Sequence, residues 1–199
     1  MFLDDSFCNV DLDIFRENYN IIVEEYKKFR DAKYLINYSH LYDLTSSLNP
    51  RFSGHIPRLT EDHPWKICPL IYNRSSIPLL PIEIQNSKTV EILLSQKIKP
   101  VVAVFSILEP GVVLDKHHDT DERIDPRYLD SSVIKIHFSL DIPLSGESGL
   151  VVEDEERILS NGDLNLFDEH YTHYAYNKSL HRRGVLIASY IRKEIVDIW

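Results

Sequence analysis

Cysteine is scarce in this sequence, and so are long apolar runs. The chain has only two cysteines, Cys8 and Cys68, too few for a disulfide framework or a cysteine-based zinc site. No stretch is apolar over the length that a membrane-spanning helix needs, and residues 1–13 lack the basic start and apolar run of a secretory leader. We therefore expect free thiols, a cytoplasmic location and no membrane partner.

Positive charge is in deficit as well. The chain carries 22 lysines and arginines against 31 aspartates and glutamates, a formal net charge of −9 at pH 7. An acidic surface repels phosphate backbones, which disfavours a nucleic-acid partner. The hydrophobic share of 43% and the charged share of 27% are those of a folded globular chain. We expect a single domain over residues 1–199, in an oligomeric state that the sequence leaves open.

Helical spacing dominates the N-terminal part of the chain, over about residues 1–50. Between residues 13 and 31, apolar side chains recur on one face and charged side chains on the other. This pattern predicts an amphipathic helix packed on the core. Asn86 or Ser87 is a suitable N-cap for a second helix that runs to about Gln96.

The pattern becomes extended in a core of about residues 100–192. Over residues 133–142 the odd-numbered side chains, among them Lys135 and His137, point one way and the even-numbered apolar ones point the other. Short strands about ten residues apart, separated by turns such as Asn161-Gly162, predict a sandwich, barrel or jelly roll. The other expected strands are residues 65–72, 101–108, 112–114, 150–153, 164–167 and 184–192.

His117 and Asp119 follow directly on one expected strand, and His173 lies near the end of another. Residues two apart in an extended segment point to the same side, so His117 and Asp119 can hold one ion with His173 as third ligand. Two histidines and one carboxylate, with open coordination positions, form the facial triad of non-haem iron(II) oxygenases. A His-x-Asp pair alone is a weak signal, since exposed loop histidines also produce it. His118 and His170 compete for the ligand roles.

Arg183 begins the apolar strand that follows the one bearing His173. An enzyme that uses 2-oxoglutarate needs a cation at the closed end of its pocket, and arginine binds a carboxylate through two parallel hydrogen bonds. The alternative is a surface arginine beside His181 and Arg182. In a jelly roll the strand order would bring Arg183 near the metal ligands, which favours the first interpretation.

Several motifs, in this order, resemble the aspartyl/asparaginyl β-hydroxylase family of Fe(II)/2-oxoglutarate-dependent oxygenases. The resemblance runs from about Trp65 to Arg192. Residues 104–111 (VFSILEPG) are similar to the family's F-S-x-L-x-P-G strand and turn, and residues 133–140 (VIKIHFSL) to its R-L-x-x-H-L-x-L strand. Residues 162–168 (GDLNLFD), followed by His173 and Arg183, are similar to its G-x-x-x-x-F-D…H segment and the arginine after it.

The resemblance implies a mainly β fold with flanking helices, a double-stranded β-helix of the jelly-roll, cupin-like kind. It implies a dioxygenase that hydroxylates an amino-acid or peptidyl side chain, using Fe(II), 2-oxoglutarate as cosubstrate and O2, and releasing succinate and CO2. His117 and His173 match the family's metal histidines, and Asp119 places the chain with relatives that carry His-x-Asp. The family's 2-oxoglutarate-binding positions are matched by Ser106, His137 and Arg183.

The candidate residues for substrate recognition are Lys135, Arg123 and Trp65. Lys135 stands where the family often has an arginine near the substrate, and lysine keeps the charge but loses the planar fork. Residues 120–132 exceed the family's usual connection and carry Arg123, a candidate for a substrate lid, while Trp65 is a candidate for the substrate cleft. Two other functions stay open: a non-catalytic jelly-roll binding or interaction protein, and a cupin-type metal enzyme that uses no 2-oxoglutarate.

Overall fold

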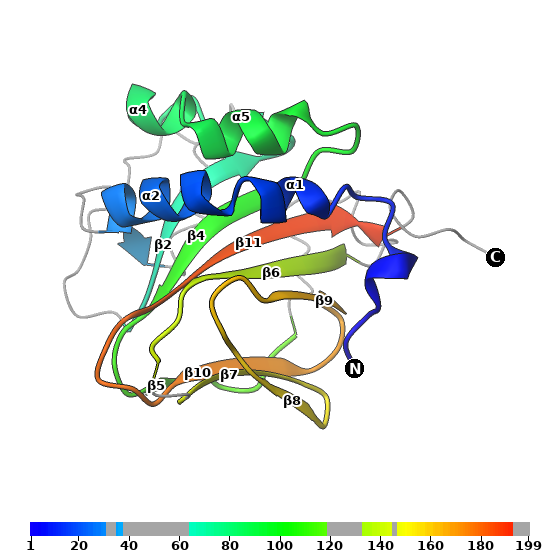
Figure 1. Ribbon diagram of the computed structural model, residues 1–199, viewed down its shortest axis with the longest axis vertical. Coiled ribbons are helices and arrows are strands. Elements are labelled where there is room, and N and C mark those ends of the chain that lie inside the picture. Colours follow the sequence, from blue (N-terminus) through cyan, green and yellow to red (C-terminus); the bar gives the residue numbers. More distant parts are fainter. Residues whose placement is uncertain (31–34, 38–63, 119–132, 145–146, 193–199) are drawn as a thin grey trace, which may run out of the picture.

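The computed structural model describes residues 1–30, 35–37, 64–118, 133–144 and 147–192. Two antiparallel β-sheets lie face to face. Helices from the N-terminal half of the chain cover the outer face of the larger sheet, and the smaller sheet lies on the other side of it (Figure 1). The helices and the smaller sheet therefore each bury one face of the larger sheet.

The larger sheet has seven strands within the described residues. They run in the order β1-β2-β4-β11-β6-β9, with β3 paired to β2. Their bounds are β1 Ile36–Asn37, β2 Trp65–Tyr72, β3 Ser75–Ser76, β4 Val102–Leu108, β6 Val133–Asp141, β9 Leu164–Asp168 and β11 Arg183–Ile191.

The smaller sheet has four strands in the described part of the chain, in the order β5-β10-β7-β8. From β4 onward the chain passes back and forth between the sheets, so that β4, β6, β9 and β11 lie in the larger one. This strand order is that of a double-stranded β-helix, which confirms the predicted mainly β, jelly-roll fold. The bounds are β5 Val112–Val113, β7 Ser148–Val152, β8 Glu155–Ile158 and β10 His173–Asn177.

Helices α1 (Asp13–Glu17) and α2 (Tyr19–Arg30) occupy the predicted helix at residues 13–31, with a turn between them. The turn falls at Asn18, whose side-chain amide donates to the carbonyl oxygen of Ile14 at 2.8 Å. This local hydrogen bond competes with the helical pattern and explains the interruption.

The second predicted helix is α5 (Lys88–Ser95), and its N-cap is Ser87, whose hydroxyl accepts a hydrogen bond from the Val90 amide. Two short helices, η1 (Asp5–Phe7) and α4 (Ile82–Gln85), lie outside the predicted elements. None of the helices described is long and apolar enough to cross a membrane.

Strand β6 divides its side chains between two environments. Ile134, Ile136 and Phe138 belong to the core beneath the helices, where the Phe138 ring meets Phe15 of α1 edge-on at 5.8 Å between centroids. Lys135 and His137 of the same strand point to the space between the sheets. The alternation in the sequence therefore determines which side chains face the interior of the β-helix.

The predicted strands differ from the observed ones at their ends, and the two-residue strands β1 and β3 and the longer β8 were not predicted. β8 is an edge strand paired only with β7, and its side chains are mostly exposed and charged. Such a strand carries little hydrophobic alternation, so its sequence does not signal it. Cys8 and Cys68 are free thiols, as predicted.

Candidate active site

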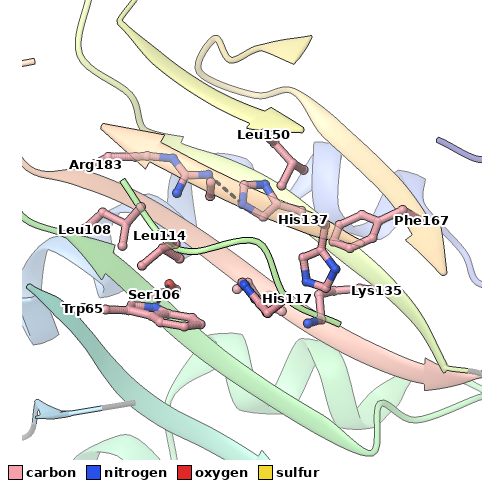
Figure 2. A pocket seen from close by; sticks show the side chains of 13 residues that line it. Trp65, Ser106, Leu108, Leu114, His117, Lys135, His137, Leu150, Phe167 and Arg183 are labelled. Atoms are coloured by element: carbon pink, nitrogen blue, oxygen red, sulfur yellow. Dashed lines mark hydrogen bonds between the residues drawn. The ribbon is translucent and has the colours of Figure 1, made fainter. Parts of the chain in front are cut away.

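A cavity lies between the two sheets (Figure 2). Apart from the predicted site residues named next, most of its wall is apolar and includes Leu108, Leu150 and Ile187. The sequence-predicted residues that line it are Trp65 of β2, Ser106 of β4, His117 after β5, Lys135 and His137 of β6, His173 of β10 and Arg183 of β11.

His117 and His173 lie side by side in this cavity. Their backbones form an isolated antiparallel bridge, with hydrogen bonds of 3.0 and 2.8 Å, and their ring centroids are 4.5 Å apart. The Nδ1 atom of His117 lies 2.6 Å from the Asp115 carbonyl oxygen, and that of His173 lies 2.8 Å from the Tyr171 carbonyl oxygen. Donation from Nδ1 to a carbonyl fixes each ring and leaves the lone pair on Nε2, the usual arrangement of metal-binding histidines.

The two competing histidines lie elsewhere. His118 is exposed and does not line the cavity. His170 turns back to Asp168, with its Nδ1 atom 3.1 Å from a carboxylate oxygen of that residue. The structure therefore brings together the predicted pair, His117 and His173.

Arg183 lies at the other end of the cavity, only 2% exposed. Its Nη2 donates to Nε2 of His137 at 2.8 Å (Figure 2). Within the described residues no carboxylate pairs with this guanidinium, and its Nε has no hydrogen-bond partner. Burial lowers the pKa of Arg183 to about 10, so the group stays charged at neutral pH. A buried cation without a counter-ion is an anion-binding group.

His137 holds Arg183 in place as a neutral imidazole. Burial, followed by the neighbouring Arg183 charge, keeps the pKa of His137 well below its usual value. Because arginine can only donate, Nε2 of His137 is the acceptor and Nδ1 carries the proton. The neutral ring therefore orients the guanidinium without cancelling its charge.

Ser106 and Trp65 form the wall beside the histidines. The Trp65 indole N–H donates to the Ser106 hydroxyl oxygen at 2.9 Å, and the Trp65 ring centroid lies 6.1 Å from that of His117. The indole occupies a lone pair of the hydroxyl, so the hydroxyl hydrogen can be directed to a ligand.

Lys135 is the second cation of the cavity. It is 8% exposed, and its Nζ lies 3.7 Å from a carboxylate oxygen of Glu169 and 5.9 Å from the Phe167 ring centroid. The Phe167 ring in turn packs at 4.9 Å from the His173 ring. Phe167 belongs to the 162–168 motif, but the sequence assigned it no role in the site, and Glu169 lies outside the motifs. Nothing in the sequence indicates the Glu169 contact, which depends on the pairing of β6 with β9.

Asp119 and Arg123 lie outside the described residues. Within the described part of the chain, no group of three or more His, Cys, Asp or Glu side chains is placed to hold a metal. The assignment of Asp119 as third ligand and of Arg123 as a substrate residue therefore stays a prediction.

The sequence was also compared with known proteins. No curated protein matches it. Among solved structures it is similar to KdgF from Halomonas sp., with 16% sequence identity, coverage of 68% of this chain and 84% of that one, and a TM-score of 0.39. It is also similar to a Cupin_2 domain of an XRE family transcriptional regulator from Enterobacter cloacae, with 16% sequence identity, coverage of 64% of this chain and 96% of that one, and a TM-score of 0.38. It spans 61% of a Photorhabdus luminescens protein, with 12% identity over 45% of this chain and a TM-score of 0.34. The fold assignment rests on the strand order described above.

A family comparison gives a broader match. The family described as aspartyl/asparaginyl beta-hydroxylase matches residues 16–193, which include helix α2 and all the strands that line the cavity. Because this match extends over most of the chain, the protein belongs to the aspartyl/asparaginyl β-hydroxylase family.

Proposed function

We propose that this protein is an Fe(II)/2-oxoglutarate-dependent dioxygenase that hydroxylates an amino-acid or peptidyl side chain. The observation that carries the proposal is the content of the cavity. Two anchored imidazoles, His117 and His173, lie at one end of it, and the buried cation Arg183 lies at the other. A ligand that chelates a metal and also carries a distant carboxylate matches both ends.

The residues present fit an iron(II) ion. His117 and His173 would hold it through Nε2, because Nδ1 of each ring faces a backbone carbonyl. We propose Asp119 as the third ligand, which completes the facial triad. When bound, iron(II) and 2-oxoglutarate supply the oxidation in which one oxygen atom of O2 enters a substrate C–H bond and the other enters succinate, with release of CO2.

The chain's own residues bind and orient the cosubstrate in this proposal. Arg183 pairs with the distal carboxylate of 2-oxoglutarate, and the carboxylate restores the counter-charge that the buried guanidinium lacks among the described residues. His137 keeps the guanidinium oriented toward this carboxylate, and the Ser106 hydroxyl donates a hydrogen bond to 2-oxoglutarate as well. Apolar walls exclude water, which strengthens these charged contacts.

The substrate side is assigned to Lys135 and Trp65, together with Arg123 of residues 120–132. The Lys135 ammonium lies beside the histidine end of the cavity, where a carboxylate or carbonyl of an amino acid or peptide can reach it. We propose a cytoplasmic enzyme that acts on a small molecule or peptide and has no nucleic-acid or membrane partner.

Ligand binding tests the cosubstrate site without turnover. Manganese(II) and N-oxalylglycine, an unreactive analogue of 2-oxoglutarate, should together raise the melting temperature, since a ligand that binds only the folded state stabilises it. Arg183→Ala should weaken N-oxalylglycine binding by about 2–5 kcal/mol, because a buried charged contact is lost. Arg182→Ala is the matched control. Arg182 is 41% exposed and donates to Glu109 at 3.0 Å, so its loss should leave affinity unchanged.

Equal affinity in the Arg183→Ala and wild-type proteins would remove the assigned role of Arg183. Turnover then separates the remaining functions. A screen of free amino acids and short peptides should yield succinate and a product heavier by one oxygen atom. Metal binding without succinate would indicate a cupin-type enzyme of another chemistry, and the absence of any metal binding would indicate a non-catalytic jelly-roll protein.

A further inference from the structure

The connection between β10 and β11 joins the two ends of the candidate site. It follows the strand that begins with His173, and it leads directly into Arg183. A cluster of buried polar side chains, Ser148, Asn177 and Ser179, lies at its base, with exposed fractions of 0%, 0% and 2%. These residues lie outside the sequence motifs, and none of them lines the cavity.

Asn177 contacts the backbone of the segment that precedes Arg183 and that of the end of β4, which pairs with Arg183. Its NH2 group donates to the carbonyl oxygen of His181 at 2.7 Å and shares its second hydrogen between those of Leu108 and Glu109, each at 3.1 Å. Leu108 is the residue of β4 that pairs with Arg183 in the sheet. His181 precedes Arg183 by two residues. One amide group therefore ties the start of β11 to the end of β4.

The orientation of the Asn177 amide is fixed. Its Oδ1 accepts from the Ser148 hydroxyl at 3.1 Å, from the Ser179 hydroxyl at 2.7 Å and from the Ser179 amide at 3.3 Å. Reversal of the amide would place its NH2 group against the Ser179 N–H and its oxygen against carbonyl oxygens. Donors and acceptors match in only one orientation, so the side chain acts as a rigid clamp.

The side chain of Arg183 has few polar contacts, so the position of its guanidinium depends on its backbone and on packing. Among the described residues, the hydrogen bond to His137 is its side-chain contact to a polar group, and Nε has no partner. A buried arginine that forms an ion pair is held at its guanidinium end by the carboxylate. The guanidinium of Arg183 is instead placed largely by its backbone, which Asn177 anchors.

We propose that Asn177 is a positioning residue for the cosubstrate: it fixes the backbone from which Arg183 reaches the distal carboxylate. This inference rests on the proposed function. A displacement of about 1 Å at such a site can cost up to about a hundredfold in function, so loosening the clamp should weaken cosubstrate binding.

Two serines give a matched test. Ser148→Ala and Ser179→Ala each remove one buried hydroxyl that donates to Asn177. The Ser179 hydroxyl also contacts the His181 backbone, at 2.8 Å to the carbonyl oxygen and 3.1 Å from the amide nitrogen, on the path to Arg183. Ser179→Ala should lose more thermal stability than Ser148→Ala, because its hydroxyl has more hydrogen-bond partners, so binding is compared at a temperature at which both variants are folded. Only Ser179→Ala should raise the Kd for N-oxalylglycine with manganese(II), by about tenfold, and Ser148→Ala should stay within about twofold of wild type.

A third variant, Asn177→Asp, keeps the shape and the accepting oxygen but removes the donor to Leu108, Glu109 and His181. It should raise the Kd and the KM for 2-oxoglutarate more than Ser179→Ala does, while kcat at saturating 2-oxoglutarate changes little. If Asn177→Asp fails to fold, the comparison of Kd values between Ser148→Ala and Ser179→Ala still tests the inference.

Equal Kd values for the two serine variants, whether raised or unchanged, would overturn the inference and leave the proposed function intact. Failure of the wild-type protein to bind N-oxalylglycine would instead contradict the proposed function, and the inference would fall with it.

Discussion

His137 illustrates how burial determines the state of a single side chain. The ring is 3% exposed, and the charged guanidinium of Arg183 lies against its Nε2. Protonation would place two positive charges in contact inside the protein, which is why the pKa of His137 lies well below its usual value. A neutral His137 lets Arg183 keep its full charge for an anion.

The lowered pKa predicts how stability depends on pH. Because the folded state resists protonation of His137, the unfolded chain takes up this proton first as the pH falls through about 6.5. The free energy of unfolding should therefore decrease below that pH, by at most about 1.4 kcal/mol per pH unit from this residue. His137→Asn removes the titrating group. Urea unfolding from pH 7.5 to 5 should show a shallower decrease for this variant, and equal slopes would contradict the assigned state of His137.

Helix α2 and strand β11 meet at a point where only glycine fits. A Cβ atom at Gly184 would overlap the ring of Tyr26, which is fully buried. Gly184 directly follows Arg183, and the pairing of β11 with β6 shifts register between Gly184 and Val185. Helix α2 therefore packs on the larger sheet directly behind the start of β11.

Gly184→Ala should destabilise the fold by about 1–3 kcal/mol, because the added methyl group overpacks this contact. Tyr26→Leu, which shortens the opposing side chain, is expected to be costly alone. Combined with Gly184→Ala it should cost at least about 1 kcal/mol less than the sum of the single changes. Urea unfolding of the four proteins in this cycle measures the coupling. Additive effects on the free energy of unfolding would show that the Tyr26 ring is not what excludes a side chain at position 184.

The elements differ in how far their sequences predict them. β6 was predicted because its alternation separates Ile134 and Ile136 from Lys135 and His137, and both faces are buried in different surroundings. α5 was predicted from its capping serine. β8 carries charged, exposed side chains and has no such signal. The interruption at Asn18 depends on one side-chain hydrogen bond that competes with helical geometry, which the periodicity of apolar residues does not reveal.

At the scale of the whole molecule, the two sheets bring distant segments of the chain to one cavity. A row of aromatic rings extends from the N-terminal segment to the site. Phe2 meets Phe167 edge-on at 6.2 Å, Phe167 lies 4.9 Å from His173, and His173 lies 4.5 Å from His117. Next to Phe2, the Leu3 amide donates to Leu166 of β9 at 2.8 Å. The N-terminal segment thus packs against the β-helix behind the histidines.

The sequence predicted which residues face the cavity more fully than it predicted how they are held. His117, His173 and Arg183 could be selected because they stand in motifs with recognisable spacing. The choice of His117 over His118, and of His173 over His170, could be made because strand geometry and motif position agree. Asn177 and Glu169 could not be found in this way. Asn177 meets Leu108 only because the two sheets come together, and Glu169 meets Lys135 only because β9 pairs with β6.

The most direct measurement is the visible absorption spectrum of the protein with iron(II) and 2-oxoglutarate under anaerobic conditions. Iron(II) chelated by a 2-oxo acid gives a charge-transfer band that neither component gives alone. The band should form in the wild-type protein and in His118→Ala, whose altered residue is exposed, and it should be lost in His117→Ala. No band in folded wild-type protein, or an undiminished band in His117→Ala, would contradict a metal held between His117 and His173.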